Sequence, residues 1–294
     1  MNILITGASS GFGKLIVGEL LKAGHAVAGT VRDAEGRNAE AADLLRDLGA
    51  EIVDLDVTGD ASVEAGVAAA SQKLGGIEVL INNAGVGVHG LQENFSAADL
   101  LRVFDVNVFG PQRMVRAVLP QMRARGEGLI LNVSSLLGRV TLPFYGPYNA
   151  TKWALEAMSE NYRAELSQFG VDVAIVEPGG FPTEFHGNLL LPASTDRNDG
   201  YGPFADAPAA ARQNMNDFLA ANPQQDPALV AEAIVAIVGA TPGTRPFRTE
   251  VDRVGMGDLV KPINDLSATN TAALFTNLGM AEMLNLKVAN QEAA

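Results

Sequence analysis

The feature that most constrains this chain is a regular alternation between short apolar runs and longer stretches with helical periodicity. The runs suited to buried strands are residues 2–6, 26–31, 50–54, 77–81, 129–134, 171–177 and 245–251. Amphipathic stretches lie between most of them, at residues 14–21, 39–48, 62–74, 97–123, 148–166 and 227–239. Neighbouring parallel strands require crossovers of this kind. The alternation therefore predicts an α/β fold with a doubly wound parallel sheet and helices on both faces.

Length and composition limit the classes of protein that this chain can belong to. Its 294 residues suffice for one large domain, and no shift in composition marks a boundary, so we expect a single domain over residues 1–294. A net charge of −13 without a basic run disfavours nucleic acid and anionic membranes as partners. The chain has no cysteine, which excludes disulfides, thiol nucleophiles and Cys-ligated zinc.

The sequence also bears on location and on metals. The first strand-like run begins directly after Met1, which leaves no room for a leader peptide, and no apolar run approaches about 18 residues. We therefore expect a cytoplasmic protein that does not associate with membranes. The three histidines, His25, His89 and His186, are too scattered to predict a metal site.

The first apolar run ends in a glycine-rich turn that leads into a helical stretch. Gly7, Gly11 and Gly13 would permit a tight turn and the close approach of a pyrophosphate to a helix N-terminus. A phosphate loop of the Walker type does not fit, because Ala8 stands where its first glycine belongs and Leu15 where a hydroxyl is needed. An ordinary turn between a strand and a helix remains the alternative.

The end of the second run bears on which dinucleotide could bind. An acidic residue at this point would bind the ribose 2′-hydroxyl, whereas a basic one suits a 2′-phosphate. Here the neutral Val31 is followed by Arg32. The sequence therefore favours NADP(H), with NAD(H) possible, because Arg32 could also be a solvated charge paired with the adjacent Asp33.

Tyr148 and Lys152 stand four residues apart in a predicted helix, so their polar ends would lie on one face. An ammonium group beside a phenol favours the phenolate, and we expect the pKa of Tyr148 to fall toward neutrality. Such a phenol can act as a general acid or base on a carbonyl or an alcohol. The alternative is a buried tyrosine with a surface lysine one turn later. Tyr145 is a competing phenol, but Asn149, four residues after it, carries no charge.

Past residue 183 the alternation breaks. Residues 184–226 are rich in Asn, Asp, Pro and Gly, with one helix expected at 207–221. A long insertion after the carboxyl end of a strand is a natural place for a substrate lid, and a surface excursion is the alternative. Residues 252–294 form a C-terminal extension, in which we expect a helix over 268–286.

With these residues in view, the chain resembles the short-chain dehydrogenase/reductase family in its compact single-domain branch, over about residues 1–183. The resemblance rests on motifs that occur in the family's order. They are the glycine turn, Asn82-Asn83-Ala84-Gly85, Asp105-Val106-Asn107-Val108, Ser135 thirteen residues before Tyr148, Tyr148-x-x-x-Lys152, and Pro178-Gly179 with Thr183. It implies a Rossmann-like fold.

The resemblance implies a role for each member of a catalytic tetrad. Tyr148 would donate the proton to the substrate carbonyl, and Ser135 would polarise that carbonyl. Lys152 would lower the tyrosine pKa and bind the nicotinamide ribose, and Asn107 would hold a water molecule that links Lys152 to solvent. Ser134 competes with Ser135, and only the family spacing separates them.

The resemblance also implies a cofactor site. We expect it to comprise Gly7, Ser9, Ser10, Gly11, Phe12, Gly13, Arg32, Asp56, Val57, Asn83, Ala84, Gly85, Tyr148, Lys152, Pro178, Gly179, Phe181 and Thr183.

The function that follows is an NADP(H)-dependent oxidoreductase that transfers a hydride between nicotinamide and a small carbonyl compound or secondary alcohol. An epimerase or dehydratase of the related longer-chain branch is one alternative, and a non-catalytic regulator that senses NADP(H) is another. Because helices of this family often pair across a two-fold axis, we also expect a homodimer or homotetramer.

Overall fold

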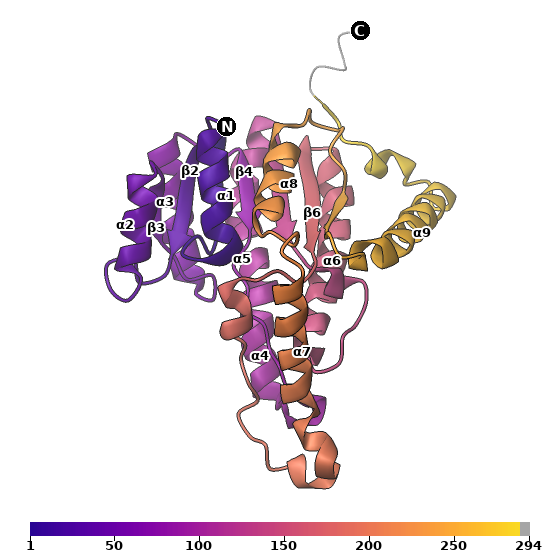
Figure 1. The fold of residues 1–294 in the computed structure, drawn as a ribbon. Helices are drawn as coiled ribbons and strands as arrows, with labels where there is room; N and C mark the ends of the chain where they lie inside the picture. Colours follow the sequence, from indigo (N-terminus) through magenta and orange to yellow (C-terminus); the bar gives the residue numbers. More distant parts are fainter. Residues whose placement is uncertain (289–294) are drawn as a thin grey trace.

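The computed structural model describes residues 1–288, so residues 289–294 of the expected C-terminal extension lie outside the described part (Figure 1). Within it, seven parallel strands form one sheet in the order β3-β2-β1-β4-β5-β6-β7. Their bounds are β1 Asn2–Ile5, β2 Ala26–Val31, β3 Glu51–Asp54, β4 Val79–Asn82, β5 Gly128–Val133, β6 Val171–Pro178 and β7 Arg248–Val251. Each predicted strand is present, which confirms the doubly wound parallel sheet.

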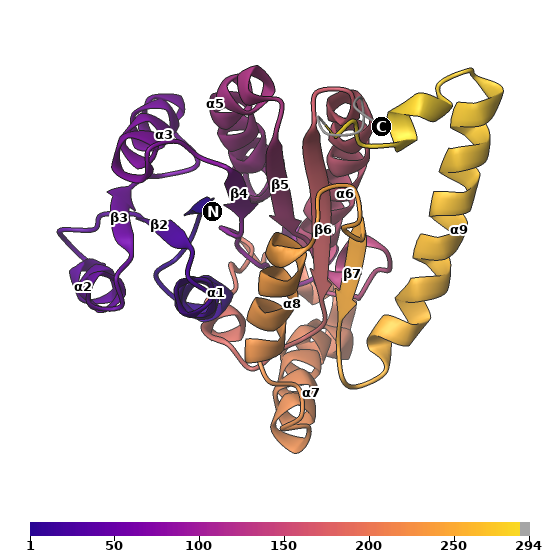
Figure 2. The same ribbon diagram turned by 90° about the horizontal axis from the view of Figure 1, so that it is seen from above.

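Helices cover both faces of the sheet, as Figure 2 shows from above. On one face, α1 packs against α8 and α2, and on the other, α3 packs against α5, with α6 against β6. The bounds are α1 Gly11–Lys22, α2 Ala39–Asp47, α8 Ala228–Gly239, α3 Asp60–Leu74, α5 Gly110–Arg125 and α6 Gly146–Ser167.

The core follows from the alternation of side chains along each strand. In β1, Ile3 and Ile5 point into the core beneath α1 and α8, whereas Leu4 points into the core beneath α3 and α5. All three are fully buried. Both faces are apolar because both are covered, which is why the strands read as continuous hydrophobic runs.

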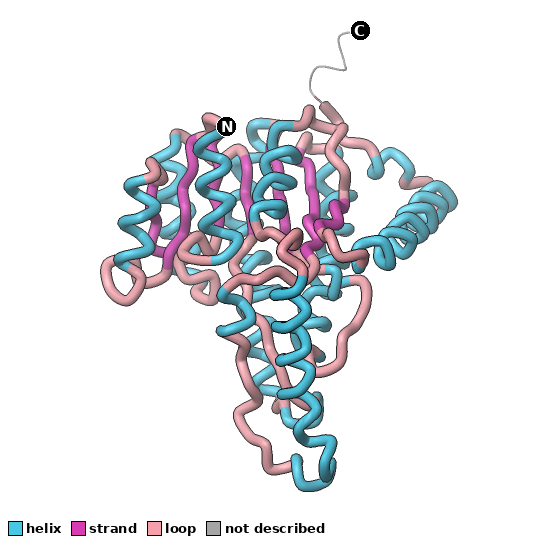
Figure 3. Tube along the Cα trace, viewed as in Figure 1, coloured by secondary structure: helices cyan, strands magenta, loops and turns pink. Residues whose placement is uncertain are grey.

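The chain order reverses beside β1, because β2 and β3 extend from one side of it and β4 to β7 from the other. In folds of this kind, ligands bind outside the carboxyl ends of the strands at such a reversal. Figure 3 shows the loops that meet there, and an arm that extends beyond them. The arm contains α4 (Ala97–Phe104), α7 (Ala207–Ala221) and the 3-10 turns Gln92–Asn94, Glu184–Gly187 and Asn198–Asp206.

Two helix predictions need correction. The helix expected at 97–123 is divided into α4 and α5 by a π-helical turn, Asp105–Phe109. The terminal helix expected at 268–286 begins earlier, because α9 spans Met256–Asn277 and only a 3-10 turn, Ala281–Leu284, follows. The Asp252 carboxylate accepts hydrogen bonds from the backbone N–H groups of Val254, Met256 and Gly257, which stabilises the start of α9. The helix expected at 207–221 is confirmed by α7.

Candidate active site

A cavity of about 640 Å³ lies at the carboxyl ends of the strands. Every residue of the expected cofactor site lines it, together with Ser134 and Ser135. Of the expected tetrad, only Asn107 does not line the cavity. The fold thus gathers residues from seven separate segments of the first 183 positions into one cavity.

The glycine turn is shaped by close backbone approach. Gly7 has a φ of +68°, and a Cβ there would lie 2.8 Å from the Cα of Ala84. A Cβ on Gly13 would lie 2.0 Å from the carbonyl oxygen of Gly7. A side chain at either position would therefore push the turn away from the strands that hold it. The helix α1 begins at Gly11 with no side-chain cap, so its first N–H groups face the cavity for an anionic group.

Asn83 joins the ends of two neighbouring strands. Its Nδ2 donates to the carbonyl oxygens of Thr6 at 2.9 Å and Gly7 at 3.0 Å, and its backbone N–H donates to the Thr6 hydroxyl at 3.1 Å. The neighbouring Asn82 points instead toward β5, where its Nδ2 donates to Asn132 at 2.8 Å. These amides therefore hold the rim of the cavity rigid.

Tyr148 and Lys152 lie together on α6 and are both buried, with 8% and 5% of their surfaces exposed. The Lys152 Nζ lies 5.6 Å from the centre of the Tyr148 ring and donates to the carbonyl oxygen of Val133 at 2.9 Å. The chain therefore fixes the ammonium group beside the phenol through a backbone acceptor on β5.

The expected fall in the tyrosine pKa is not found. Burial raises the pKa of Tyr148 to about 12, and hydrogen bonding to Ser135 opposes this only in part. Burial also lowers the pKa of Lys152 to about 8, against the attraction of Glu156. The physical reason is desolvation, which disfavours both charged forms in the interior. At neutral pH the phenol is therefore protonated, and the lysine is still largely an ammonium group.

The two adjacent serines differ in their partners. The Ser135 hydroxyl accepts a hydrogen bond from the N–H of Leu137 at 3.1 Å and interacts with the Tyr148 phenol. The Ser134 hydroxyl is buried without a partner in the described residues, and it lies against Gly138. Contact with the phenol thus favours Ser135, as the family spacing does.

Asn107 lies in the π-helical turn that divides α4 from α5. Its Nδ2 donates to the Val86 carbonyl at 2.9 Å and to the Thr151 hydroxyl at 3.0 Å, while its Oδ1 accepts from the Val86 N–H at 2.9 Å. A π-turn turns a side chain toward a point that a regular helix would not reach, and such turns are frequent at functional sites. Here the Asn107 side chain joins the loop after β4 to Thr151, the residue before Lys152.

At the other end of the cavity, Arg32 pairs with Asp56 and not with the adjacent Asp33. The Arg32 Nη1 lies 3.7 Å from the Asp56 Oδ2, and the arginine side chain is 53% exposed. Asp33 instead forms an ion pair with Arg37, whose Nε lies 3.9 Å from the Asp33 Oδ2. Arg37 and Asn38 also line the cavity, and sequence reasoning missed them because they lie in the irregular turn between β2 and α2.

The start of the 184–226 segment forms an apolar wall over Tyr148. The Phe185 ring lies 5.5 Å from the Tyr148 ring, and Leu190 pairs with Val88 through a β-bridge. Leu137, Leu142 and Met215 complete this side of the cavity. The segment also touches the glycine turn, where the Glu184 carboxylate accepts from the Gly11 N–H at 3.2 Å.

Comparison with known proteins identifies the family. A sequence model of the short chain dehydrogenase family matches residues 1–191. The chain belongs to this family. It is 35% identical over 249 residues to retinol dehydrogenase 8 of Homo sapiens, which covers 81% of this chain and 78% of that protein. It is 38% identical over 199 residues to a 3-ketodihydrosphingosine reductase of Bacteroides thetaiotaomicron, covering 68% and 71%.

Solved structures of short-chain dehydrogenases share the whole fold. One from Streptomyces avermitilis is 32% identical, covers 95% of this chain and 97% of its own, and has a TM-score of 0.74. One from Burkholderia phymatum with bound NAD is 27% identical, covers 91% and 95%, and has a TM-score of 0.75. The actinorhodin polyketide ketoreductase with NADPH is also 27% identical, covers 87% and 97%, and has a TM-score of 0.72. The protein is thus an oxidoreductase of the kind that uses a nicotinamide cofactor.

The residues of this short-chain dehydrogenase fit a dinucleotide. The close approach at Gly7 and Gly13 and the uncapped start of α1 suit a pyrophosphate. In the described part of the chain, no helix is long and apolar enough to span a membrane, and no group of His, Cys, Asp and Glu side chains could hold a metal ion.

Proposed function

We propose that this short-chain dehydrogenase is an NADP(H)-preferring reductase of apolar ketones that also oxidises the corresponding secondary alcohols. The observation that carries the proposal is the buried phenol of Tyr148, which lies beside Ser135 and Lys152 beneath an apolar wall. When bound, the cofactor would supply or accept the hydride. Gly7, Gly11, Gly13, Asn83, Pro178, Gly179 and Thr183 would hold it, with Arg32 and Arg37 near a 2′-phosphate.

The protonation states of the site support the reductive direction. Because the pKa of Tyr148 is about 12, its phenol carries the proton that a developing alkoxide needs. Ser135 would donate a second hydrogen bond to the same oxygen, and two donors stabilise negative charge more than they stabilise a neutral ketone. Lys152 would place its positive charge beside the phenol when the proton leaves.

The wall over Tyr148 supports an apolar substrate. Phe185, Leu190 and Met215 come from the segment after residue 183, and Leu137 and Leu142 from the loop after β5. The two curated relatives carry names that refer to retinol and to a sphingosine precursor. Both point to long apolar molecules, and we extend that class to this chain.

Residues 184–226 are proposed to close over this substrate. Two of their polar contacts with the rest of the arm are exposed, Arg197 to Glu93 at 2.8 Å and the Tyr201 hydroxyl to Glu93 at 2.9 Å, whereas Leu190 is held by backbone hydrogen bonds to Gly87 and His89. The exposed contacts exchange readily with water, so opening the outer part of the segment would cost little free energy. We also propose that the protein is cytoplasmic and that it forms a homodimer or homotetramer. The oligomer is supported by Trp153 of α6, whose side chain is 45% exposed.

The decisive experiment compares two tyrosine variants on the same helix. Tyr148→Phe removes the phenol that faces the cavity, and Tyr162→Phe removes one that bonds Gln112 outside it. With 2-decanone and NADPH, we expect Tyr148→Phe to lose at least about a hundredfold in kcat with NADPH affinity unchanged within a few-fold. Tyr162→Phe should retain activity. Equal activity of Tyr148→Phe and the unmodified protein would refute the acid role.

A further inference from the structure

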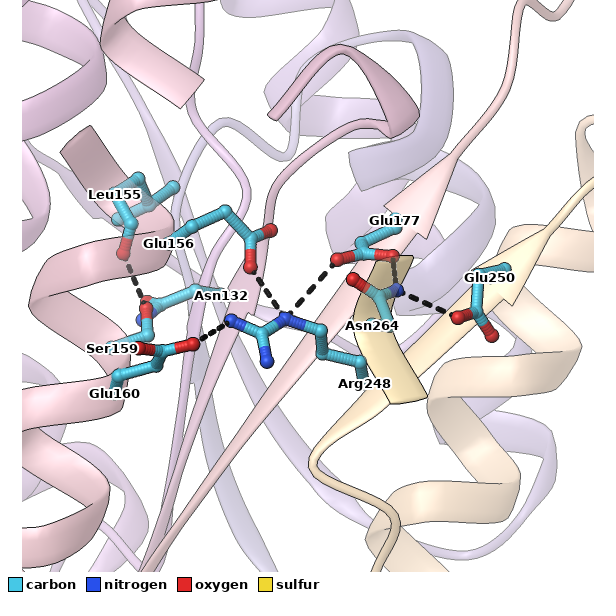
Figure 4. Close-up of polar contacts among 9 residues, drawn as sticks. All are labelled: Asn132, Leu155, Glu156, Ser159, Glu160, Glu177, Arg248, Glu250 and Asn264. Carbon is cyan, nitrogen blue, oxygen red and sulfur yellow. Dashed lines mark hydrogen bonds and ion pairs between the residues drawn. The ribbon is translucent and has the colours of Figure 1, made fainter. Parts of the chain in front are cut away.

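A buried polar cluster begins at Glu156, one helical turn after Lys152 on α6, and Figure 4 shows its members. Its centre is Arg248 of β7, whose Nε lies 2.8 Å from the Glu156 Oε2 and 3.4 Å from the Glu177 Oε1. The Arg248 Nη2 donates to the Glu160 Oε1 at 2.6 Å. On the far side of Glu177, the Asn264 Nδ2 of α9 donates to Glu177 and to Glu250, each at 2.7 Å.

The cluster contains more carboxylates than the interior can hold as anions. The side chains of Glu156 and Glu177 are only 2% and 0% exposed, and the arginine between them is 6% exposed. Glu160 is 33% exposed and so reaches solvent. The charged groups that face the cluster are Lys152, Glu160 and Arg163 from α6, Glu177 from β6, Arg248 and Glu250 from β7, and Lys261 from α9, which acts on Glu250.

The two buried carboxylates are not equivalent. Burial, and then repulsion from Glu156, raises the pKa of Glu177 well above its ordinary value. Glu177 therefore takes up the proton, and the neutral acid still accepts the hydrogen bond from Asn264. Glu156 keeps a direct ion pair with Arg248 at 2.8 Å, and Lys152 lies four residues earlier on the same helix.

The hydrogen-bond acceptor of Lys152 is uncharged, so the charge of the ammonium group needs a partner elsewhere. The lysine Nζ donates to the neutral carbonyl of Val133, which orients the group but does not compensate its charge. Among the described residues, Glu156 is the carboxylate whose attraction opposes the desolvation of the lysine. We propose that Glu156, a buried carboxylate one helical turn after Lys152, is a positioning residue of the reaction and acts through Lys152 as the countercharge of its ammonium group.

The proposal rests on the function proposed above, since Lys152 matters only if Tyr148 transfers a proton. A purely structural role for Glu156 is the competing explanation, because the residue also anchors β7 through Arg248. Glu160 separates the two explanations. It binds the same guanidinium at 2.6 Å from the next turn of α6, but it stands one turn farther from Lys152 and is 33% exposed, so solvent screens its charge.

The experiment compares Glu156→Gln with Glu160→Gln over a range of pH, using 2-decanone and NADPH. Removing one negative charge near the lysine should lower its pKa by about one unit. The ammonium form is then lost at lower pH, so we expect the alkaline fall in kcat of Glu156→Gln to move about one unit toward neutrality. In Glu160→Gln it should stay in place. Equal displacement in both variants, or in neither, overturns the proposal.

A second readout does not depend on turnover. Reductive methylation with formaldehyde and cyanoborohydride modifies the neutral amine, so its rate at Lys152, followed by mass spectrometry against pH, reports the lysine directly. The midpoint should fall by about one unit in Glu156→Gln and not in Glu160→Gln. Absence of turnover in the unmodified protein would refute the proposed function, while the methylation midpoints would still decide the role of Glu156.

A paired variant guards against loss of folding, because Glu156→Gln leaves Arg248 with one buried partner fewer. Glu156→Gln with Arg248→Gln replaces the ion pair by two neutral amides. Compared with Arg248→Gln alone, which lacks the same guanidinium, it should show a methylation midpoint about one unit lower if Glu156 acts on Lys152. Equal midpoints in the two folded variants overturn the proposal.

Discussion

The two ends of the cavity are built in different ways. At the cofactor end, backbone groups and short amides such as Asn83 form the surface, and close approaches at Gly7 and Gly13 leave no space for side chains. At the substrate end, the surface consists of large apolar side chains, and Phe185 and Leu190 come from outside the strand–helix repeat. Backbone geometry tolerates little change, whereas an apolar wall can be rebuilt with other side chains of similar size. Substitutions at the cofactor end should therefore lower affinity strongly, whereas substitutions at the substrate end should change affinity only modestly.

The strongest test of this comparison is Gly13→Ala. The added methyl group would lie 2.0 Å from the Gly7 carbonyl oxygen, so the turn must move away from its ligand. We expect NADPH affinity to fall by about a hundredfold or more, which corresponds to about 2.7 kcal/mol. Thermal stabilisation by saturating NADPH measures the loss.

Gly18→Ala is the matched control, because it lies on the same helix with no atom within 4 Å of its added methyl group. It should bind NADPH normally and be slightly more stable, since alanine favours a helix over glycine. If Gly13→Ala bound NADPH as tightly as Gly18→Ala does, the cofactor end would tolerate substitution and the comparison would fail.

The next largest effect is expected at Arg32. Arg32→Asp replaces a cation at the cavity edge by an anion, which repels a 2′-phosphate and can bind a 2′-hydroxyl. We expect the ratio of kcat/KM for NADPH to that for NADH to fall by about ten- to a hundredfold. Steady-state kinetics with both cofactors measure it. An unchanged ratio would assign the 2′-phosphate to Arg37, which Arg37→Ala would then show.

At the substrate end, Phe185→Ala should act through substrate alone. It removes the ring that lies 5.5 Å from Tyr148, and the lost apolar contact should raise KM for 2-decanone by about three- to tenfold. Affinity for NADPH should change less than twofold. A comparable loss of affinity for both ligands would show that the two ends are not independent.

The smallest effect concerns the contact between the ends. Glu184, the first residue of the 184–226 segment, accepts a hydrogen bond from the Gly11 N–H, where an anionic pyrophosphate would compete with it. Glu184→Gln removes the negative charge, so NADPH should bind about two- to fivefold more tightly at low salt, and the gain should shrink as salt increases. Fluorescence titration at two ionic strengths would measure this. Weaker binding would mean that Glu184 supports the cofactor instead of competing with it.

Much of the fold follows from local pattern. The central strands were predicted because they are buried on both faces and therefore read as apolar runs, as Leu129 to Leu131 do. The edge strands β3 and β7 are partly exposed, and they were predicted from their place in the alternation. The helix at 207–221 was also predicted. The π-turn at Asn107 was not, since its residues have the same apolar spacing as a regular helix. The start of α9 was missed because it is stabilised by the Asp252 carboxylate, which accepts hydrogen bonds from the N–H groups of Met256 and Gly257, and the helical periodicity does not show such contacts.

The candidate site divides in the same way. The sequence by itself determined which groups meet at the cavity, because parallel strands bring their carboxyl ends to one edge and the motifs follow those ends. Only the tertiary structure decided the state of those groups. Burial holds the phenol of Tyr148 in its protonated form, and the fold brings the exposed Arg32 side chain to Asp56 and buries Glu156 one helical turn from Lys152. Desolvation and long-range charge depend on what surrounds a residue in space, and neighbours in the chain do not reveal it.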